Sequence, residues 1–324
     1  MSKICCQDFE PYVQDWSDQL LINYPPRLVF NIFASRDTLP AHSGCDRKYM
    51  KRNRLKAVKR PLDTGCCAIQ GPPCCIDYSY AIIKPQFYGC HATLSMTETL
   101  QSAVPKVQGY VDGFTEQLRL TEDWLTGQTF KANASVYWAR YGTSPDNPKE
   151  MTGKDFLMAA NIPLDHEAMP VLKGQEGECK FDTSPINAGL VGIVHSHLRP
   201  DLYNLIPLFT PKYKYPQPNL ALQSEEGAIG DVRILIARGE NADDALITPE
   251  SSELGNDVYD IPILGQDAFV IIDQEDLKPQ ISFRDAGGAH PLCMYVSWMM
   301  SYGTGIVNEN FIVNMKVTRG AQTC

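Results

Sequence analysis

Apolar and polar positions are most sharply patterned near the C-terminal end, over residues 286–317. Only Glu309 and Lys316 carry a full charge in this stretch, so most of it must be buried against segments that come earlier in the chain. Apolar and polar residues alternate over 311–317, which predicts a half-buried final strand inserted among earlier ones. One face would carry Phe311, Val313, Met315 and Val317, and the other Ile312, Asn314 and Lys316.

The same stretch is a poor candidate for a membrane span. A bilayer requires roughly 20 consecutive apolar residues, and glycine and polar residues interrupt the run before it reaches that length. The interrupting residues are Gly303, Gly305, Asn308, Glu309 and Asn310. We therefore expect the protein to have no membrane partner.

Residues 11–40 predict an extended N-terminal arm that carries one helix. Trp16, Leu20 and Tyr24 have helical spacing, and the proline pair that follows would end that helix. An arm that makes few contacts with its own chain usually needs a partner. Trp16 and Leu20 are therefore candidates for contact with another subunit.

A cationic segment follows at 46–60, in which Asp46 is the only acidic residue. Three interpretations stay open: a solvated strand face, a contact with an acidic neighbouring chain, or a contact with a nucleic-acid backbone. Tyr49 is the only aromatic residue in the segment, so a platform for stacking bases is disfavoured. The candidate contact residues are Arg47, Lys48, Lys51, Arg52, Arg54, Lys56, Lys59 and Arg60.

A turn-rich stretch at 61–75 and a strand candidate at 76–93 come next. Together with the cationic strand before them, they predict a long two-stranded excursion. An isolated hairpin is only marginally stable in water, so this one must lie on something, either on its own chain or on another copy.

Two helices are predicted after this excursion. From 105 to about 126 the apolar residues form one stripe, and at about 1.5 Å per residue this helix would be roughly 33 Å long. The second helix starts near Thr152, where Thr152 and Asp155 resemble a capping box, and it runs towards Met169. The stripe of the first helix consists of Val107, Val111, Phe114, Leu118 and Leu125.

The rest of the chain mixes strands with short helices. Strands are predicted at 190–194, 232–237 and 269–273, with a short helix at 265–268 before the last of them. The proline-rich stretch 209–218 is predicted to be a surface loop. This mixture indicates an α+β or α/β sub-domain.

Composition places the chain among folded, acidic proteins. Its 324 residues are 44% hydrophobic and 21% charged, which is typical of a globular protein with two sub-domains or with one domain and long excursions. The formal net charge is -9, which disfavours general nucleic-acid binding because that affinity depends on Lys and Arg. The N-terminus shows no signal-peptide pattern, so we expect synthesis in a reducing cytoplasm.

The chain contains 11 cysteines, several of them in adjacent pairs. A zinc site prefers ligands about two to four residues apart, and the pairs in the turn-rich stretch do not have that spacing. Free thiols, disulfides formed late between subunits, and a metal site all stay open, with free thiols favoured. The candidates for an inter-subunit disulfide are Cys66, Cys67, Cys74 and Cys75.

His195 and His197 are the nearest approach to a metal site. On a strand they would share one face, and Asp201 follows, but the sequence fixes no third ligand. Polar residues that end a strand are the favoured interpretation, with a metal-dependent hydrolase as an alternative. The sequence contains no phosphate-loop, serine-hydrolase or zinc-protease motif. We therefore expect no enzyme and no cofactor, and a nucleic-acid-binding protein that uses Arg47 to Arg60 is a further alternative.

A family resemblance is spread over most of the chain. It includes WSDQLL, PPRLVFNIFA, PQFYGCHATLSMTE, MTGKDFLMAANIPL, GLVGIVHSHLRPDLYNL, AIGDVRILIA, DVYDIPILGQDAF and VSWMMSYGTGIVNENFIVNMKV. In this order and spacing the segments resemble the major capsid proteins of tailed double-stranded DNA bacteriophages, in particular the family typified by podovirus N4. The chain departs from that family at His195-Ser196, where His-Pro is common.

The resemblance implies a Hong Kong 97-type capsid fold, which is an α+β architecture. An N-terminal arm would span 1–45, and an extended β-hairpin loop 46–92. A peripheral domain with a long spine helix would span 93–188, and an axial domain 189–278. The chain would then return to the peripheral domain with its closing strand over 279–324.

The resemblance also implies the function of a major capsid protein. Copies would assemble into hexamers and pentamers that form an icosahedral head around the double-stranded DNA genome. The implied partners are other copies of the chain, scaffolding, cement and portal proteins, and packaged DNA contacted without sequence specificity. The implied location is the virion capsid, assembled in the cytoplasm of the bacterial host.

Overall fold

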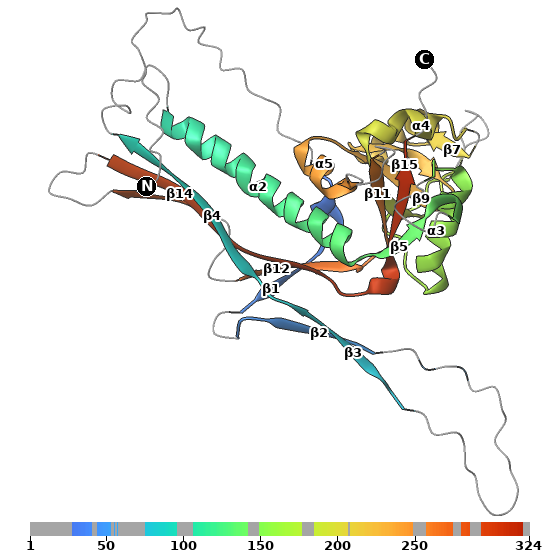
Figure 1. Ribbon diagram of the computed structural model, residues 1–324, viewed down its shortest axis with the longest axis horizontal. Coiled ribbons are helices and arrows are strands. Elements are labelled where there is room, and N and C mark those ends of the chain that lie inside the picture. Colours follow the sequence, from blue (N-terminus) through green and yellow to red (C-terminus); the bar gives the residue numbers. More distant parts are fainter. Residues whose placement is uncertain are drawn as a thin grey trace, which may run out of the picture.

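The computed structural model describes residues 28–40, 44–52, 55, 57, 75–95, 106–141, 149–176, 185–206, 208–248, 257–274, 280–285 and 293–319. They form two large sheets, a separate two-stranded hairpin, and helices that pack on the sheets (Figure 1). The long helix α2 (Lys106–Asn133) runs along one face of the first sheet. The helices α3 (Gly153–Asp165), α4 (Arg199–Tyr203) and α5 (Glu240–Leu246) lie around the second. The hairpin projects away from the body (Figure 1).

The first sheet has five strands, and its central strand is β14 (Cys293–Ile306). The order is β1 (Ser35–Leu39), β12 (Phe269–Gln274), β14 and β13 (Gln280–Asp285), and β4 (Gln86–Ser95) also pairs with β14. Val296, Trp298 and Met300 on one face of β14 belong to the same core cluster as Phe114 and Leu118 of α2. The apolar stripe predicted for this helix therefore packs on the sheet.

The second sheet has eight strands and holds most of the other buried residues. The predicted strands at 190–194 and 232–237 are confirmed within it as β6 and β9. Its order is β5 (Ser135–Trp138), β15 (Ile312–Thr318), β11 (Val258–Leu264), β6 (Leu190–His195), β9 (Val232–Ala237), β8 (Glu225–Ile229) and β7 (Phe209–Pro211), with β10 (Ile247–Thr248) paired to β11.

The predicted final strand is confirmed as β15, which lies between β11 and β5. It is buried on both faces along most of its length, so the prediction of a half-buried strand was wrong. Its apolar face joins the core cluster that contains Phe156 of α3. On the other face, Asn314 and Lys316 reach the buried carboxylate of Asp260, at 3.2 Å and 3.3 Å. Polar residues at these positions thus indicate a buried partner and not solvent.

Helix α2 confirms the predicted helix in its position but extends it to Asn133, over 28 residues. The extra turns are stabilised by Phe130, whose ring packs edge-on against Phe269 at a centroid distance of 4.7 Å. Gly127 allows α5 to approach closely, because a Cβ there would lie 2.5 Å from the Cβ of Ala245. The helix extends because tertiary contacts compensate for a glycine that weakens it locally.

Residues 28–39 pack on the body of the chain, so this part of the predicted arm makes more self-contacts than expected. The turn η1 (Phe30–Phe33) is held by Asp123 of α2, whose Oδ1 accepts from the backbone N–H of Phe30 at 2.9 Å and of Asn31 at 3.3 Å. Strand β1 then pairs in parallel with β12. Asp123 lies about ninety residues away in sequence and β12 lies further still, which is why local patterns could not reveal these contacts. Trp16 and Leu20 lie outside the described residues.

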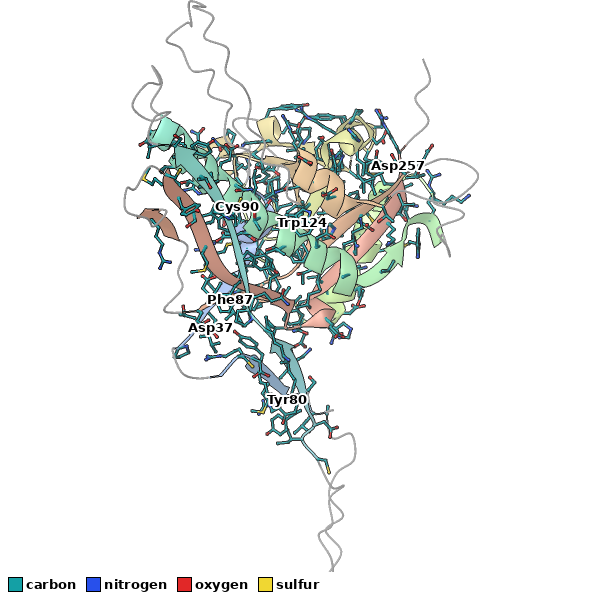
Figure 2. All side chains as sticks on the ribbon, turned by 60° about the vertical axis from the view of Figure 1, so that its left-hand side comes forward. Asp37, Tyr80, Phe87, Cys90, Trp124 and Asp257 are labelled. Carbon is teal, nitrogen blue, oxygen red and sulfur yellow. The ribbon has the colours of Figure 1, made fainter. Side chains whose placement is uncertain are left out.

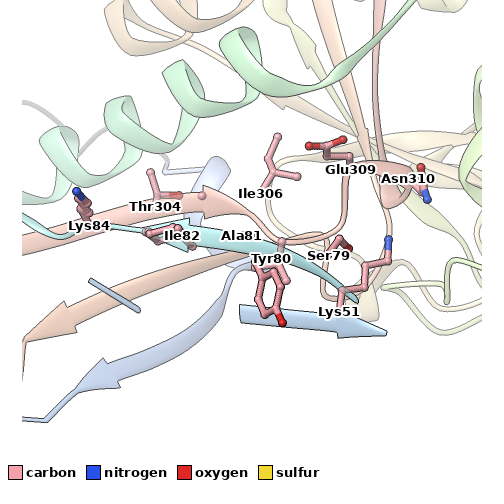
Figure 3. A pocket seen from close by; sticks show the side chains of 13 residues that line it. Lys51, Ser79, Tyr80, Ala81, Ile82, Lys84, Thr304, Ile306, Glu309 and Asn310 are labelled. Carbon is pink, nitrogen blue, oxygen red and sulfur yellow. The ribbon is translucent and has the colours of Figure 1, made fainter. Parts of the chain in front are cut away.

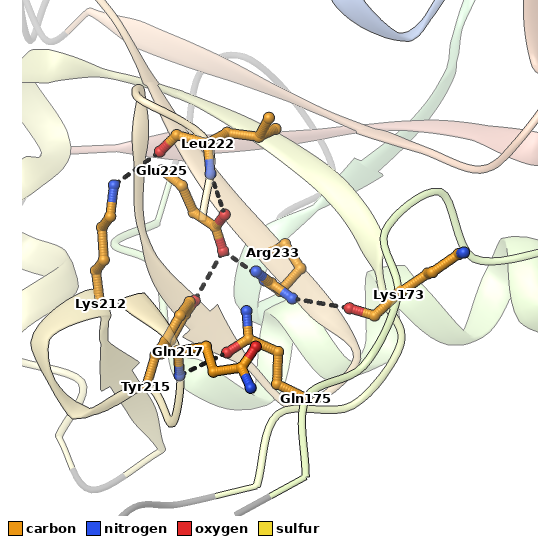
Figure 4. A network of polar contacts seen from close by, with 8 residues as sticks. All are labelled: Lys173, Gln175, Lys212, Tyr215, Gln217, Leu222, Glu225 and Arg233. Carbon is orange, nitrogen blue, oxygen red and sulfur yellow. Dashed lines mark hydrogen bonds and ion pairs between the residues drawn. The ribbon is translucent and has the colours of Figure 1, made fainter. Parts of the chain in front are cut away.

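The predicted surface loop at 209–218 is exposed only in part, because Phe209, Pro211 and Tyr215 are buried in it. It begins with β7, and the side chain of Tyr215 is buried, with its hydroxyl donating to Glu225 Oε1 at 2.9 Å (Figure 4). Glu225 also accepts from the backbone N–H of Leu222 at 3.0 Å and forms a buried ion pair with Arg233. The prolines shape this segment, but the buried carboxylate holds it on the sheet.

The two remaining helix predictions have different outcomes. The capping box is confirmed, because the backbone N–H of Thr152 donates to Asp155 Oδ2 at 2.8 Å, and α3 ends at Asp165, before Met169. The predicted helix at 265–268 was wrong: this stretch is a turn. Asp267 adopts a φ of 55°, which belongs to the left-handed region and is incompatible with a right-handed helix.

Candidate functional site: the projecting hairpin

The projecting hairpin consists of β2 (Arg47–Arg52) and β3 (Tyr78–Ile83), which pair antiparallel as the predicted excursion requires. The single strand predicted at 76–93 is wrong, because it ends at Ile83 and its second half is β4, which pairs with β14 in the first sheet. Residues directly opposite each other across two strands point to the same face. The register therefore defines an inner and an outer face. The inner face holds the pairs Arg47–Ile83, Tyr49–Ala81 and Lys51–Ser79, and the outer face holds Lys48–Ile82, Met50–Tyr80 and Arg52–Tyr78.

The base of the inner face is docked on the first sheet. Ile83 belongs to a small core cluster with Leu39 of β1 and with Val270 and Ile272 of β12, and Tyr49 packs against it. Val270 and Ile272 alternate along β12 with residues that face α2, so this cluster lies on the opposite side of the sheet from the helix. The hairpin base and α2 thus enclose the sheet between them.

Polar contacts reinforce this docking. Asp37 of β1 accepts from the hydroxyl of Tyr49 at 2.7 Å and pairs with the guanidinium of Arg47 at 3.1 Å. Burial, together with the Asp37 carboxylate, raises the pKa of the Tyr49 phenol above its ordinary value, so the hydroxyl stays a donor. Further along β2, Lys51 donates to the side-chain oxygen of Asn308. Two of the cationic candidates are therefore engaged within the chain.

Beside β3, the hairpin and the body are separated by a groove of about 510 Å³ (Figure 3). One wall is β3 from Ser79 to Ile83 together with Lys84, and the other is the end of β14 with the turn that follows it. Lys51 lines the groove from β2, while Glu309 and Asn310 line it from the body. Apart from its base, the hairpin is therefore not packed tightly on its own chain.

The outer face exposes a row of large apolar side chains. The exposed fractions are 63% for Met50, 62% for Tyr80, 53% for Ile82 and 47% for Tyr78. Figure 2 shows Tyr80 on the part of the hairpin that stands clear of the body. Single exposed apolar residues are ordinary, but a contiguous row is typical of a surface that binds another macromolecule. Lys48 and Arg52 share this face, so the surface combines apolar and cationic groups.

The structure thus divides the cationic candidates. Arg47 and Lys51 contact their own chain, whereas Lys48 and Arg52 lie exposed on the outer face. Arg54, Lys56, Lys59 and Arg60 lie outside the described residues. The apolar half of this surface is not among the residues predicted from sequence, although large apolar side chains at alternate positions of β3 could have indicated it. Those residues are Tyr78, Tyr80 and Ile82, with Met50 opposite them.

The cysteine prediction is not tested by the described part of the chain. Cys75 is exposed and free, as are Cys45 and Cys90. Cys66, Cys67 and Cys74 lie outside the described residues. An inter-subunit disulfide that involves this cluster stays a prediction.

His195 and His197 lie together, but both nitrogens of His195 are already engaged. Its Nε2 is 2.6 Å from Asp243 Oδ1, and its Nδ1 accepts from the backbone N–H of His197 at 3.1 Å. His197 Nδ1 is 3.2 Å from the hydroxyl of Tyr259. Burial lowers the pKa of His195, which fits a neutral ring that donates on one side and accepts on the other.

This arrangement gives His195 no free lone pair for a metal ion. His197 does not share a strand face with it, because the turn η4 (Ser196–Leu198) begins at once after β6. In the part of the chain that the structure describes, no three or more His, Cys, Asp or Glu side chains gather where they could hold a metal ion. The helices among these residues also include none that is long and apolar enough to cross a bilayer.

Solved structures of phage capsids match this fold over the full chain. The capsid of Ralstonia phage GP4 has 10% sequence identity and a TM-score of 0.71, with 100% of this chain and 100% of that chain covered. The capsid of cyanophage Pam1 has 10% identity and a TM-score of 0.68, with coverage of 98% and 100%. The capsid of Helicobacter pylori bacteriophage KHP30 has 9% identity and a TM-score of 0.64, with coverage of 98% and 98%.

No family model matches the sequence, and no curated protein matches it either. At these low identities, the structural matches show the fold. They confirm the expectation of an α+β, Hong Kong 97-type capsid fold.

Proposed function

We propose that this chain is a major capsid protein of a tailed bacteriophage, and that copies of it assemble into a closed shell around double-stranded DNA. The observation that carries the proposal is the full-length structural likeness to several phage capsids. The resemblance in sequence to the N4-like family is a finer part of the same proposal.

The outer face of the hairpin supports self-assembly on physical grounds. Fully burying one large apolar side chain is worth about 1.5–3 kcal/mol. An exposed ion pair is worth only about 0.2–1 kcal/mol. The apolar row of Met50, Tyr80 and Ile82 would therefore supply most of the affinity for a neighbouring subunit, while Lys48 and Arg52 would set its register. Each contact of this kind would contribute a modest binding free energy, but a closed shell would contain many copies of it.

The domain layout stays part of the proposal. The first sheet with α2 would form the peripheral part, and the second sheet the axial part around the centre of each capsomer. Three strands change sides relative to the boundaries expected from sequence. Strand β12 lies within 189–278 but belongs to the first sheet, whereas β5 lies within 93–188 and β15 within 279–324, and both belong to the second.

The finer assembly follows the family pattern. Subunits would form hexamers and pentamers of an icosahedral head, assembled in the cytoplasm of a bacterial host and located in the virion capsid. Scaffolding, cement and portal proteins are proposed partners, and the packaged DNA would be contacted without sequence specificity. The net charge of -9 suits an inner face that must release DNA during ejection.

Expression of the full chain followed by negative-stain electron microscopy tests the proposal. We expect closed particles of uniform diameter at high subunit concentration. A compact monomer at every concentration would contradict the proposal.

The alternatives receive less support. A metal-dependent hydrolase would need free lone pairs on His195 and His197, and His195 has none. A nucleic-acid-binding protein would use Arg47 to Arg60, yet Arg47 and Lys51 are engaged within the chain. That alternative predicts a DNA affinity of the free subunit that falls steeply with salt, and its absence at low salt would exclude it.

A further inference from the structure

The direction in which the hairpin projects depends on few contacts. At its base, Ile83 presses on the backbone of β14, where a Cβ on Gly305 would lie 2.7 Å from Ile83 Cγ1. This contact sets one point of attachment but leaves rotation about that point open. The groove beside β3 means that apolar packing does not fix the angle along the length of the hairpin.

Asp37 supplies the second point of attachment. It lies on β1, which is fixed to β12 by five parallel register pairs from Ser35 to Leu39. Its carboxylate engages two residues of β2 at once, the hydroxyl of Tyr49 at 2.7 Å and the guanidinium of Arg47 at 3.1 Å. Its other oxygen accepts from the backbone N–H of Thr38 at 2.9 Å, which orients the carboxylate. Ile83 and Asp37 hold the base of the hairpin at two points, and the contact of Lys51 with Asn308 adds a third further along β2. Of these, Asp37 is the residue that engages two hairpin side chains at once.

We propose that Asp37 is the positioning residue that sets the angle of the hairpin, and through it the angle between neighbouring copies and the diameter of the particle. This inference rests on the proposed capsid function. The hairpin acts as a lever: at about 3.3 Å per residue, Tyr78 stands roughly 17 Å from Ile83. A rotation of about 10° at the base would therefore move Tyr78 by about 3 Å, enough to shift the outer apolar row relative to its neighbour.

The test compares Asp37→Ala and Tyr49→Phe with Ser35→Ala. Ser35 is a matched control because its hydroxyl bonds Asp267 at 2.6 Å from the same strand without contacting the hairpin. In the dissociated subunit, amide hydrogen exchange over 47–52 and 78–83 should quicken at least tenfold in Asp37→Ala and to a lesser degree in Tyr49→Phe. Exchange in α2 should stay unchanged, and Ser35→Ala should behave as the wild type.

The second readout is particle diameter by electron microscopy. We expect one diameter for the wild type and for Ser35→Ala, and several diameters or open sheets for Asp37→Ala, although the melting temperature of its subunit changes little. Unchanged exchange in the hairpin of Asp37→Ala would overturn the inference, and so would faster exchange with unchanged diameter. A wild type that forms no particles would instead refute the proposed function, so the two failures are distinguishable.

Discussion

Strands β6, β9 and β11 of the second sheet are buried along their whole length, whereas the hairpin strands β2 and β3 expose every residue of their outer face. In the sheet, even charged groups find partners within the chain, as Arg233 does with Glu225. In the hairpin, large apolar groups such as Met50 and Tyr80 find none in the described part of the chain. The sheet therefore stabilises the folded chain, whereas the hairpin carries an exposed apolar surface that contributes little to its stability.

This contrast predicts that the largest loss of stability comes from truncating a side chain buried beside the second sheet. Phe156 of α3 is fully buried, so Phe156→Ala should lower the free energy of unfolding by about 3–5 kcal/mol. Met50→Ala, on the outer face of the hairpin, should change it by less than about 0.5 kcal/mol. Urea unfolding of the dissociated subunit measures both. Similar losses at the two positions would contradict the division into a self-sufficient core and a dependent hairpin.

The next largest effect concerns the buried ion pair of the second sheet. Arg233→Met would leave Glu225 buried without a counter-charge, which should cost about 3–5 kcal/mol. The control is Arg199→Met, because Arg199 pairs with Glu226 but is 46% exposed, and its loss should cost less than about 1 kcal/mol. Thermal or urea unfolding distinguishes them. Equal costs would show that the Glu225 network does not anchor the 209–218 segment.

A smaller effect is expected from Asp123, which holds the N-terminal segment on α2. Burial raises its pKa from 3.8 to about 6, although hydrogen bonds from backbone N–H groups oppose this. Because the folded-state pKa lies above the unfolded value, the folded state binds the proton more tightly. The resulting stability is fully present below about pH 4 and is lost as the pH rises through 6.

Asp123→Asn should therefore flatten the pH dependence between pH 4 and 7 and gain about 3 kcal/mol at pH 7 relative to the wild type. Asp112→Asn is the control, because Asp112 is exposed on the same helix and bonds only locally, with Gln108 at 2.9 Å. The measurement is the free energy of unfolding across that pH range. A wild type that loses stability as the pH falls from 7 to 5, in parallel with its Asp123→Asn variant, would argue against a raised pKa.

The smallest effect on the subunit should accompany a large effect on assembly. Met50→Ser combined with Tyr80→Ser should change the free energy of unfolding by no more than about 0.5–1 kcal/mol, since both side chains are already in water. Particles should nevertheless be lost. The matched control is Met169→Ser with Tyr213→Ser, which are 66% and 71% exposed on the second-sheet side of the molecule. If both double variants assemble equally well, the outer face is not the contact surface.

Local patterns predicted several elements well. The stripe that includes Phe114 and Leu118 defined most of α2, Thr152 and Asp155 defined the start of α3, and the apolar run at 232–237 matches β9. Each of these signals depends on residues within one or two turns or on alternation along one strand. The residues that produce each signal lie close together in sequence, so the pattern can be recognised without knowledge of the fold.

The errors share a different origin. The prolines around Tyr215 predict a surface loop, and the polarity of Asn314 and Lys316 predicts a solvent face, but Tyr215 and Asn314 are buried and Lys316 is largely so. In each case a buried carboxylate, Glu225 or Asp260, accepts the polar group. Which carboxylate meets which donor depends on strand pairing, and that is decided by the whole fold.

By itself, the sequence determined where the helices and most strands lie, and it determined that a basic strand pairs with a later strand in an excursion from the body. Periodicity acts over short stretches of chain, so the sequence alone reveals it. Only the tertiary structure decided which face of that hairpin looks outward. It turned Arg47 and Lys51 towards Asp37 and Asn308, and left Met50 and Tyr80 exposed, because burial depends on which remote segments come to lie against each side.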